Sequence, residues 1–142
     1  MQRVRHLLAL KGQDVWSIDV EEPVLAAIQI MAEKRVGALP VTRNGELVGV
    51  ISERDYARKV ILMNRSSAET PVWQIMSSPV ITVTPQEDVR QCMQLMTEQR
   101  IRHLPVMADG RMIGMISIGD LVRAVIEEQD QTIEHLERFI QG

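Results

Sequence analysis

One segment of the sequence occurs twice at a constant offset. Leu39–Asp55 begins with Leu-Pro-Val and ends with Ser-x-x-Asp, and 65 residues later Leu104–Asp120 begins and ends in the same way. About a third of the positions between residues 16 and 60 recur at this offset, which is hard to obtain by chance. The chain therefore contains two copies of one structural unit.

Each copy predicts a strand, a helix, a hairpin of two strands and a second helix. The hairpins are indicated by Asn44-Gly45 and Asp109-Gly110, turn dipeptides that separate two apolar runs. In the first copy the elements are expected at residues 15–20, 24–34, 38–42, 47–52 and 55–63. In the second copy they are expected at 80–84, 87–99, 103–107, 112–117 and from 120 onward.

Two further segments lie outside this pattern. The first dozen residues predict a short amphipathic helix that stops at Gly12. The last helix can continue to Ile140, far beyond its counterpart in the first copy, and its apolar stripe needs a partner such as a second subunit. With residues 64–71 as the connection, we expect an N-terminal division at 1–66 and a C-terminal division at 67–142.

Composition restricts the function. The chain has 142 residues, which suits two half-size units that share one core. A net charge of −3 gives no general attraction to polyanions, and an aromatic content of 3% offers no stacking surface for single-stranded nucleic acid. We therefore predict no nucleic acid and no membrane surface as partners.

The sequence also bears on location. The single cysteine, Cys92, has no intrachain partner and lies in an apolar helical stripe. The first residues include only four consecutive apolar side chains, too few for a signal peptide, and no run approaches the roughly 18 needed to cross a membrane. We predict a cytoplasmic protein.

The repeated unit resembles the CBS domain. The segments Gly49–Asp55 and Gly114–Asp120, each with Gly-x-x-Ser-x-x-Asp, carry the likeness, which covers nearly everything from residue 15 to about 133. The whole chain resembles a stand-alone tandem pair, a Bateman module. The resemblance implies an α/β (α+β) fold in which two β-α-β-β-α repeats pack sheet to sheet about a pseudo-twofold axis, usually pairing again into a homodimer.

The resemblance also implies two clefts for adenosine-containing ligands: AMP, ADP, ATP, NAD(H) or S-adenosylmethionine. The residues support this, because Asp55 and Asp120 at helix starts can accept both hydroxyls of a ribose. Ser52 and Ser117, three residues earlier, can reach a phosphate or a hydroxyl, and backbone N–H groups at a helix start favour negative charge. The alternative for each aspartate is a plain helix cap.

Other candidate positions are carried over from the family. Arg102 and His103 precede Leu104 where basic residues often face phosphates, whereas the first copy has glycine and alanine there. Arg54 is a second phosphate candidate, and for these arginines a solvated surface position is the alternative. The first strands would contact the adenine through Ser17, Ile18, Thr82 and Val83. For Ile18 and Val83 the alternative is ordinary sheet core.

Catalytic and metal chemistry have no support in the sequence. The three histidines lie in different predicted elements, and no cluster has metal-ligand spacing. Nucleophile, phosphate-loop and dinucleotide motifs are absent from the sequence. We expect no catalytic residues, no metal and no enzyme activity.

The sequence leaves three hypotheses. The first is a non-catalytic sensor that binds an adenine nucleotide, AMP before the others, and signals its occupancy to a partner. The second is a constitutive dimerisation or interaction scaffold without ligand. The third is a regulatory subunit of a separately encoded protein, which shares the first mechanism and differs in its partner.

Overall fold

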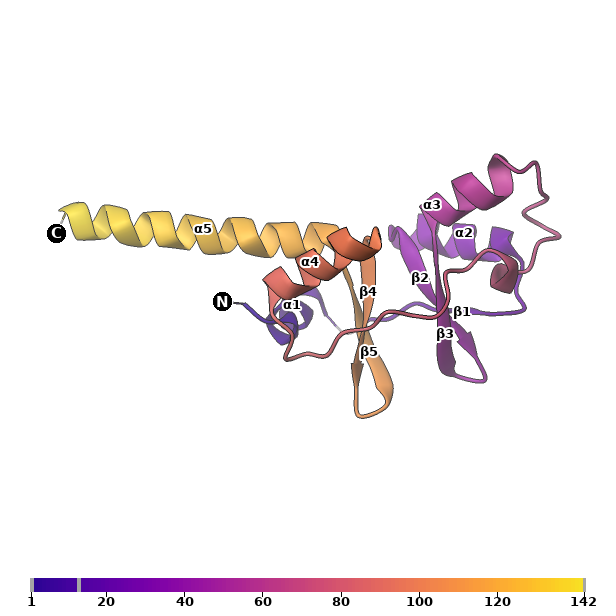
Figure 1. Cartoon of the computed structure of the whole chain (residues 1–142), viewed down its shortest axis with the longest axis horizontal. Coiled ribbons are helices and arrows are strands. Elements are labelled where there is room, and N and C mark those ends of the chain that lie inside the picture. Colours follow the sequence, from indigo (N-terminus) through magenta and orange to yellow (C-terminus); the bar gives the residue numbers. More distant parts are fainter. Residues whose placement is uncertain (1, 13, 142) are drawn as a thin grey trace. The chain divides into compact units, whose positions relative to one another are not determined.

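The computed structural model describes residues 2–12 and 14–141, which form two compact units (Figure 1). The first-repeat unit is Val15–Ile81. The second-repeat unit combines the N-terminal segment up to Asp14 with the chain from Thr82 onward. Each unit mixes helices with a small sheet, so the predicted α+β class is confirmed.

The first-repeat unit is built on a three-stranded sheet in the order β1-β2-β3. Strand β1 (Ile18–Asp19) runs parallel to β2 (Ala38–Arg43), and β2 is antiparallel to β3 (Glu46–Ser52). Helix α2 (Val24–Lys34) connects the two parallel strands, because a parallel pair needs a crossover. Its apolar stripe, with Val24, Ala27 and Met31 buried, packs into the core of the unit.

The remaining elements of this unit are short helical segments. Helix α3 (Glu53–Tyr56) continues into a π-helical turn, η1 (Ala57–Ile61), in which Leu62 N–H donates to Ala57 O at 3.0 Å. The 3₁₀ turn η2 (Val72–Gln74) returns the chain to the core, where Val72 and Ile75 are buried.

The second-repeat unit contains a two-stranded sheet and three helices. Strand β4 (His103–Ala108) is antiparallel to β5 (Arg111–Ser117). The helices are α1 (Val4–Lys11), α4 (Val89–Gln99) and α5 (Ile118–Gln141). As predicted, α1 ends at Gly12, whose φ of 91° favours glycine.

The two units repeat backbone detail at the offset of 65. Arg35 and Arg100 both close a helix in the left-handed region with φ of 56°. Asn44 and Asp109 both have φ of 53° in the hairpin turns, as the Asn-Gly and Asp-Gly sequences predict. The two hairpins also share their pairing register, including a shift at the same place. The structure thus supports the internal repeat.

The predicted first strands are shorter than expected. The segment 15–20 forms only β1, and the strand predicted at 80–84 is wrong, since it is reduced to one parallel bridge between Val83 and Val106. Val83 N–H still donates to Pro105 O, and Val83 O accepts from Met107 N–H. The chain then turns at Thr84, whose O accepts from Glu87 N–H, and proline at position 85 has no N–H to extend a ladder.

The boundaries of the two compact units differ from the expected division at residue 66. Helix α1 belongs with the second-repeat unit, and the connection through η2 belongs with the first. Helix α1 joins the second-repeat unit because it packs directly on β5. Glycine at position 114 allows this close approach, since a Cβ there would lie 2.5 Å from Leu8 Cδ2. A local pattern could not show this, because the two residues are far apart in the chain.

Candidate functional site

Ser117 and Asp120 meet where β5 passes into α5. Ser117 N–H donates to Asp120 Oδ2 at 2.9 Å, and Asp120 N–H donates to Ser117 Oγ at 3.2 Å. Each side chain therefore binds the backbone of the other, a capping box at the start of the helix.

Ser52 and Asp55 repeat this arrangement where β3 passes into α3. Ser52 N–H and Ser52 Oγ both donate to Asp55 Oδ2 at 3.0 Å, and Asp55 N–H donates to Ser52 Oγ at 3.1 Å. Both aspartates therefore cap a helix in this structure, which is the alternative role considered for them. Ribose binding by the same carboxylates stays a prediction.

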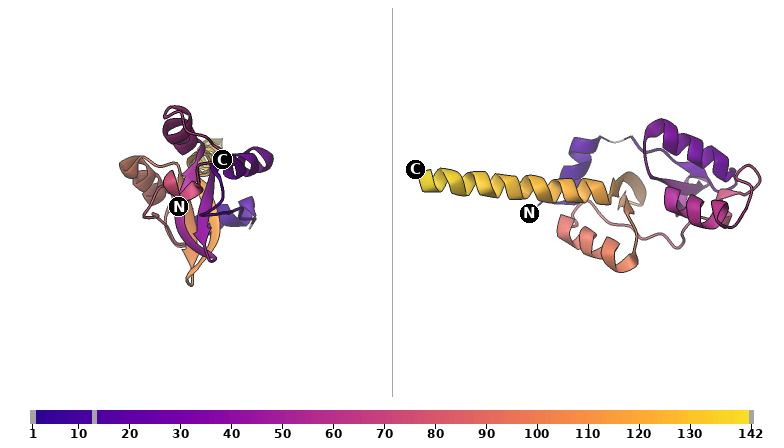
Figure 2. Two further views of the ribbon diagram at one scale, coloured as in Figure 1. Left: turned by 90° about the vertical axis from the view of Figure 1, so that its right-hand side faces the viewer. Right: turned by 90° about the horizontal axis from the view of Figure 1, so that it is seen from above.

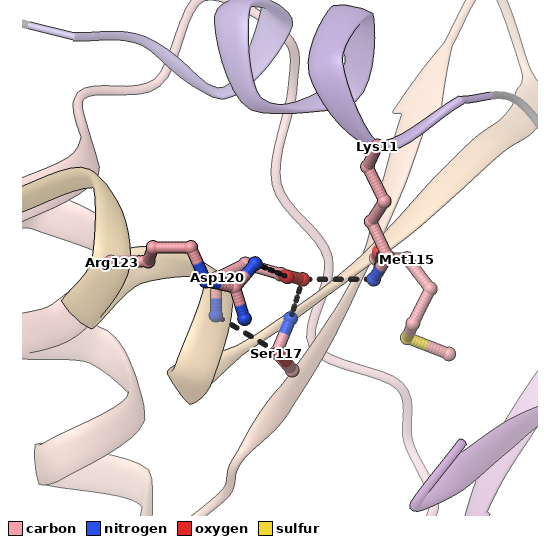
Figure 3. A network of polar contacts seen from close by, with 5 residues as sticks. All are labelled: Lys11, Met115, Ser117, Asp120 and Arg123. Atoms are coloured by element: carbon pink, nitrogen blue, oxygen red, sulfur yellow. Dashed lines mark hydrogen bonds and ion pairs between the residues drawn. The ribbon is translucent and has the colours of Figure 1, made fainter. Parts of the chain in front are cut away.

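Asp120 has a second partner that the sequence did not indicate. Lys11, at the end of α1, places Nζ 2.8 Å from Asp120 Oδ2 and also donates to Met115 O at 2.8 Å (Figure 3). On the other side, Arg123 Nη1 lies 3.7 Å from Asp120 Oδ1 (Figure 3). The carboxylate is largely covered, with 13% of its side chain exposed.

These contacts set the ionisation of Asp120. Burial alone would raise its pKa, but the hydrogen bond from Lys11, the hydrogen bonds from Ser117 and the positive charge of Lys11 outweigh burial and lower the pKa. Asp120 is therefore an anion at neutral pH, the state that accepts hydrogen bonds from hydroxyl groups most strongly.

Asp55 pairs with a lysine of its own helical segment. Lys59 Nζ lies 3.2 Å from Asp55 Oδ1 and donates to Ile75 O at 3.0 Å. In the second copy the position of Lys59 is taken by Ala124, which cannot supply a cation. Lys11 makes the corresponding pair of contacts, with an aspartate and a backbone carbonyl, from a different element.

His103 lies directly opposite Ser117 in the β4–β5 ladder, and Ala38 lies opposite Ser52 in the β2–β3 ladder. Burial lowers the pKa of His103, Lys11 lowers it further, Asp120 acts in the opposite sense, and Arg102 adds to the lowering. The charges of Lys11, Asp120 and Arg102 thus act on His103, whereas the first copy has no basic side chain opposite its serine.

For the other predicted site residues the structure gives exposure or burial but no polar contact that assigns a role. The side chains of Arg54 and Arg102 are exposed, as the alternative of a solvated arginine expects. Ser17 and Thr82 are exposed next to Ile18 and Val83, which are buried. Ile18 belongs to the core of the first-repeat unit, so its side chain serves packing.

Comparison with known proteins decides the family. The family model described as CBS domain matches residues 9–62 and again 72–127. The chain belongs to the CBS-domain family. The two matches cover both copies, so the chain contains a CBS pair, as the resemblance predicted.

Similar proteins agree with this assignment. A mitochondrial CBS domain-containing protein of Arabidopsis thaliana, CBSX3, is 49% identical over 136 residues, which cover 92% of this chain and 66% of that protein. This CBS pair therefore spans just under two thirds of that relative's length. A solved CBS-domain protein from Burkholderia ambifaria MC40-6 is 45% identical with a TM-score of 0.86, covering 90% of this chain and 96% of that one. The solved CBS domain pair of the protein MJ0100 is 24% identical with a TM-score of 0.79, covering 90% and 98%.

Lys11 and Lys59 are the residues that sequence reasoning missed at the two aspartates of this CBS pair. The sequence contained one indirect indication of Lys11. Ala124 stands at the position of Lys59 in the second copy, so that copy needs a cation from another element. The sequence alone gave no reason to select Lys11, because 109 residues separate it from Asp120.

Metal sites and membrane-spanning helices were the remaining possibilities to compare with the described residues. Within residues 2–12 and 14–141, no group of three or more His, Cys, Asp or Glu side chains is arranged to bind a metal ion. None of the helices in these ranges combines the length and apolar character of a membrane span. The chemistry at Asp120 is anionic hydrogen-bond acceptance beside several basic groups, an arrangement suited to binding a polar ligand.

Proposed function

We propose that this CBS pair is a non-catalytic sensor that binds an adenine nucleotide, with AMP as the first candidate, and signals its occupancy to a partner. The observation that carries the proposal is the grouping around Asp120. An ionised carboxylate suits ribose hydroxyls, and the basic side chain of Lys11 beside it, with His103 and the Arg102 charge that acts on His103, suits a phosphate. ATP, ADP, NAD(H) and S-adenosylmethionine contain the same adenosine portion.

A family member supports the ligand class. The CBS domain pair of MJ0100 was solved in complex with 5′-methylthioadenosine and S-adenosyl-L-methionine. At 24% identity that likeness shows the fold alone, so it serves as an example of what the fold can hold. The choice of AMP rests instead on the basic side chains, which favour a ligand that carries phosphate.

The two copies differ in ways that predict unequal sites. Asp120 has basic neighbours from α1 and β4, whereas Asp55 has Lys59 and an alanine opposite its serine. We therefore assign the phosphate-containing ligand to the second-repeat unit. Signalling further requires that the ligand bind one arrangement of the protein better than another, since equal affinities shift no equilibrium.

A second candidate function is a constitutive interaction scaffold. Exposed apolar side chains on α5 favour it, because a helix face of this kind needs a partner whether or not a ligand binds. In both cases we propose a homodimer, and in the first a separately encoded regulated protein. The predicted cytoplasmic location remains a proposal, and the Arabidopsis relative is named as a mitochondrial protein.

Thermal stability distinguishes the two candidates. A ligand present at 100 times its dissociation constant adds about 2.7 kcal/mol to the free energy of unfolding. The sensor predicts a clear rise in Tm with at least one of AMP, ADP, ATP, NADH and S-adenosylmethionine, with guanosine monophosphate as the control. An unchanged Tm with every adenosine compound favours the scaffold.

A further inference from the structure

Helix α1 brings a cation to the aspartate of the second repeat. The helix packs against β5 and α5 within the second-repeat unit (Figure 2). Its last residue, Lys11, donates from Nζ to Asp120 Oδ2 and to Met115 O, both at 2.8 Å. An ammonium group has three N–H donors, and these two contacts use two of them.

The two carboxylate oxygens of Asp120 are engaged unequally. Oδ2 accepts hydrogen bonds from Ser117 N–H at 2.9 Å and from Lys11 Nζ at 2.8 Å. Oδ1 lies 3.7 Å from Arg123 Nη1, which is beyond hydrogen-bond distance, and the arginine side chain is 69% exposed. A carboxylate oxygen has two lone pairs, so Oδ2 is filled while Oδ1 can accept further hydrogen bonds.

A ribose at this carboxylate would need both oxygens. Its two adjacent hydroxyl groups match one carboxylate when each hydroxyl donates to a different oxygen. Ser117 N–H belongs to the cap of α5, so the group that must leave Oδ2 is the ammonium of Lys11. Lys11 can leave because its side chain is 41% exposed and flexible, and it can keep Met115 O as a partner.

The displaced ammonium then needs another anion. Positive charge already accumulates here, since Lys11 and Arg102 both add to the effect of burial in lowering the pKa of His103, and Asp120 opposes them. A ligand with a phosphate supplies the anion that Lys11 loses when the ribose takes Oδ2. An uncharged nucleoside supplies none.

We propose that Lys11 is a specificity-determining residue of this site, because it competes with the ribose for Asp120 Oδ2 and so selects ligands that carry a phosphate. The inference rests on the proposed function. Adenosine must break the contact between Lys11 and Asp120 without compensation, whereas AMP gives Lys11 a new partner. Lys11 therefore opposes the binding of adenosine and favours the binding of AMP.

Titration calorimetry of the full chain with AMP and with adenosine tests this competition. Lys11→Met should weaken AMP binding about tenfold or more, because a charge-assisted contact is lost. The same variant should strengthen adenosine binding by up to about fivefold, the value of an exposed ion pair that no longer has to be broken. Arg5→Met removes an exposed cation from the same helix and should change both constants by less than about twofold.

Changes of opposite sign separate competition from a merely structural role, since looser packing of α1 would weaken both ligands. Equal weakening of AMP and adenosine, or an unchanged ratio of their affinities in Lys11→Met, would overturn the inference while nucleotide binding at Asp120 stands. A parent chain that binds neither ligand, or AMP binding that Asp120→Asn leaves unchanged, would instead overturn the proposed function and this inference with it.

Discussion

Lys11 Nζ lies 2.8 Å from Asp120 Oδ2, although the two residues belong to opposite ends of the chain. Lys59 makes the corresponding contact with Asp55 in the first repeat, at 3.2 Å. Both lysines also donate to a backbone carbonyl, and each aspartate also caps a helix. The same local arrangement is thus formed in both CBS repeats with a cation taken from different elements.

Lys11→Met should lower the free energy of unfolding at neutral pH by less than about 1 kcal/mol, because Lys11 is 41% exposed and solvent screens the pair. The pKa of Asp120 is lowered in the folded chain, so its stabilising contribution is present above the unfolded value of about 3.9 and is lost as the pH falls through the folded pKa. Urea denaturation at several pH values should show the difference between parent and variant shrinking below about pH 3.9. A full difference that persists in the background of Asp120→Asn would show that Lys11 stabilises the fold through Met115 O and not through Asp120.

Binding of a phosphate-containing ligand should cause proton uptake at His103 below the ordinary histidine pKa of about 6.5. Burial is the main reason that the pKa of His103 lies below its ordinary value, with Lys11 next, and a nearby phosphate would favour the charged imidazolium. Titration calorimetry with AMP in two buffers of different ionisation enthalpy measures this uptake. His103→Gln should remove it and the exposed His135→Gln should retain it. An unchanged uptake in His103→Gln would place the phosphate elsewhere.

Without ligand, the same lowered pKa of His103 has a consequence for stability. The unfolded chain binds more protons than the folded chain between the folded pKa and about 6.5, so this group's contribution to stability falls as the pH drops below about 6.5. In His103→Gln the loss of stability between pH 7 and pH 5 should be smaller than in the parent chain. Equal losses in denaturation experiments would mean that His103 has an ordinary pKa.

Gly49→Ala should destabilise the first repeat by about 1–3 kcal/mol, the usual cost of overfilling a packed site. A Cβ there would lie 2.5 Å from Met76 Sδ and 3.1 Å from Ser77 O, and the backbone oxygen cannot easily move. Gly119→Ala is the matched control, because its nearest atom is at 3.6 Å in the first turn of α5. There we expect no loss, or a gain of about 0.4–1 kcal/mol from the restricted unfolded chain. Equal effects of the two substitutions in urea denaturation would contradict this packing.

Cys92 should react very slowly with thiol reagents in the folded chain. Burial, together with Glu87 and Asp88, raises the pKa of its thiol to about 11, so little thiolate exists at pH 8. Reaction with a disulfide reagent should be at least ~100-fold faster in denaturing urea than in buffer, because both access and thiolate formation are restored. Similar rates in the two conditions would show that α4 opens readily.

The local parts of this fold are readable from the sequence because their causes are local. Asn44-Gly45 and Asp109-Gly110 predict the hairpins through the positive φ angles that these residues tolerate, and the structure has those angles. The capping pair Ser117 and Asp120 is separated by only three residues, so its hydrogen bonds follow from the start of the helix.

The remaining features depend on contacts that sequence patterns do not specify. The packing of α1 on β5 follows from Leu8 meeting Gly114, and the Lys11 contact follows from that packing. The strand predicted at 80–84 is reduced to one bridge at Val83 because the chain turns at Thr84, which its apolar pattern did not specify. For the same reason the sequence indicated Asp120 but not the cation beside it.

The central claim is that Asp120 binds the ribose of an adenine nucleotide. The direct measurement is the dissociation constant of AMP by titration calorimetry for the parent chain, for Asp120→Asn and for the control Glu127→Gln on the exposed face of α5. Loss of charge-assisted hydrogen bonds costs about 1.5–3 kcal/mol, so Asp120→Asn should weaken AMP binding by roughly 10-fold to over 100-fold while Glu127→Gln leaves it unchanged. Equal affinities of the parent chain and Asp120→Asn for AMP would contradict the claim.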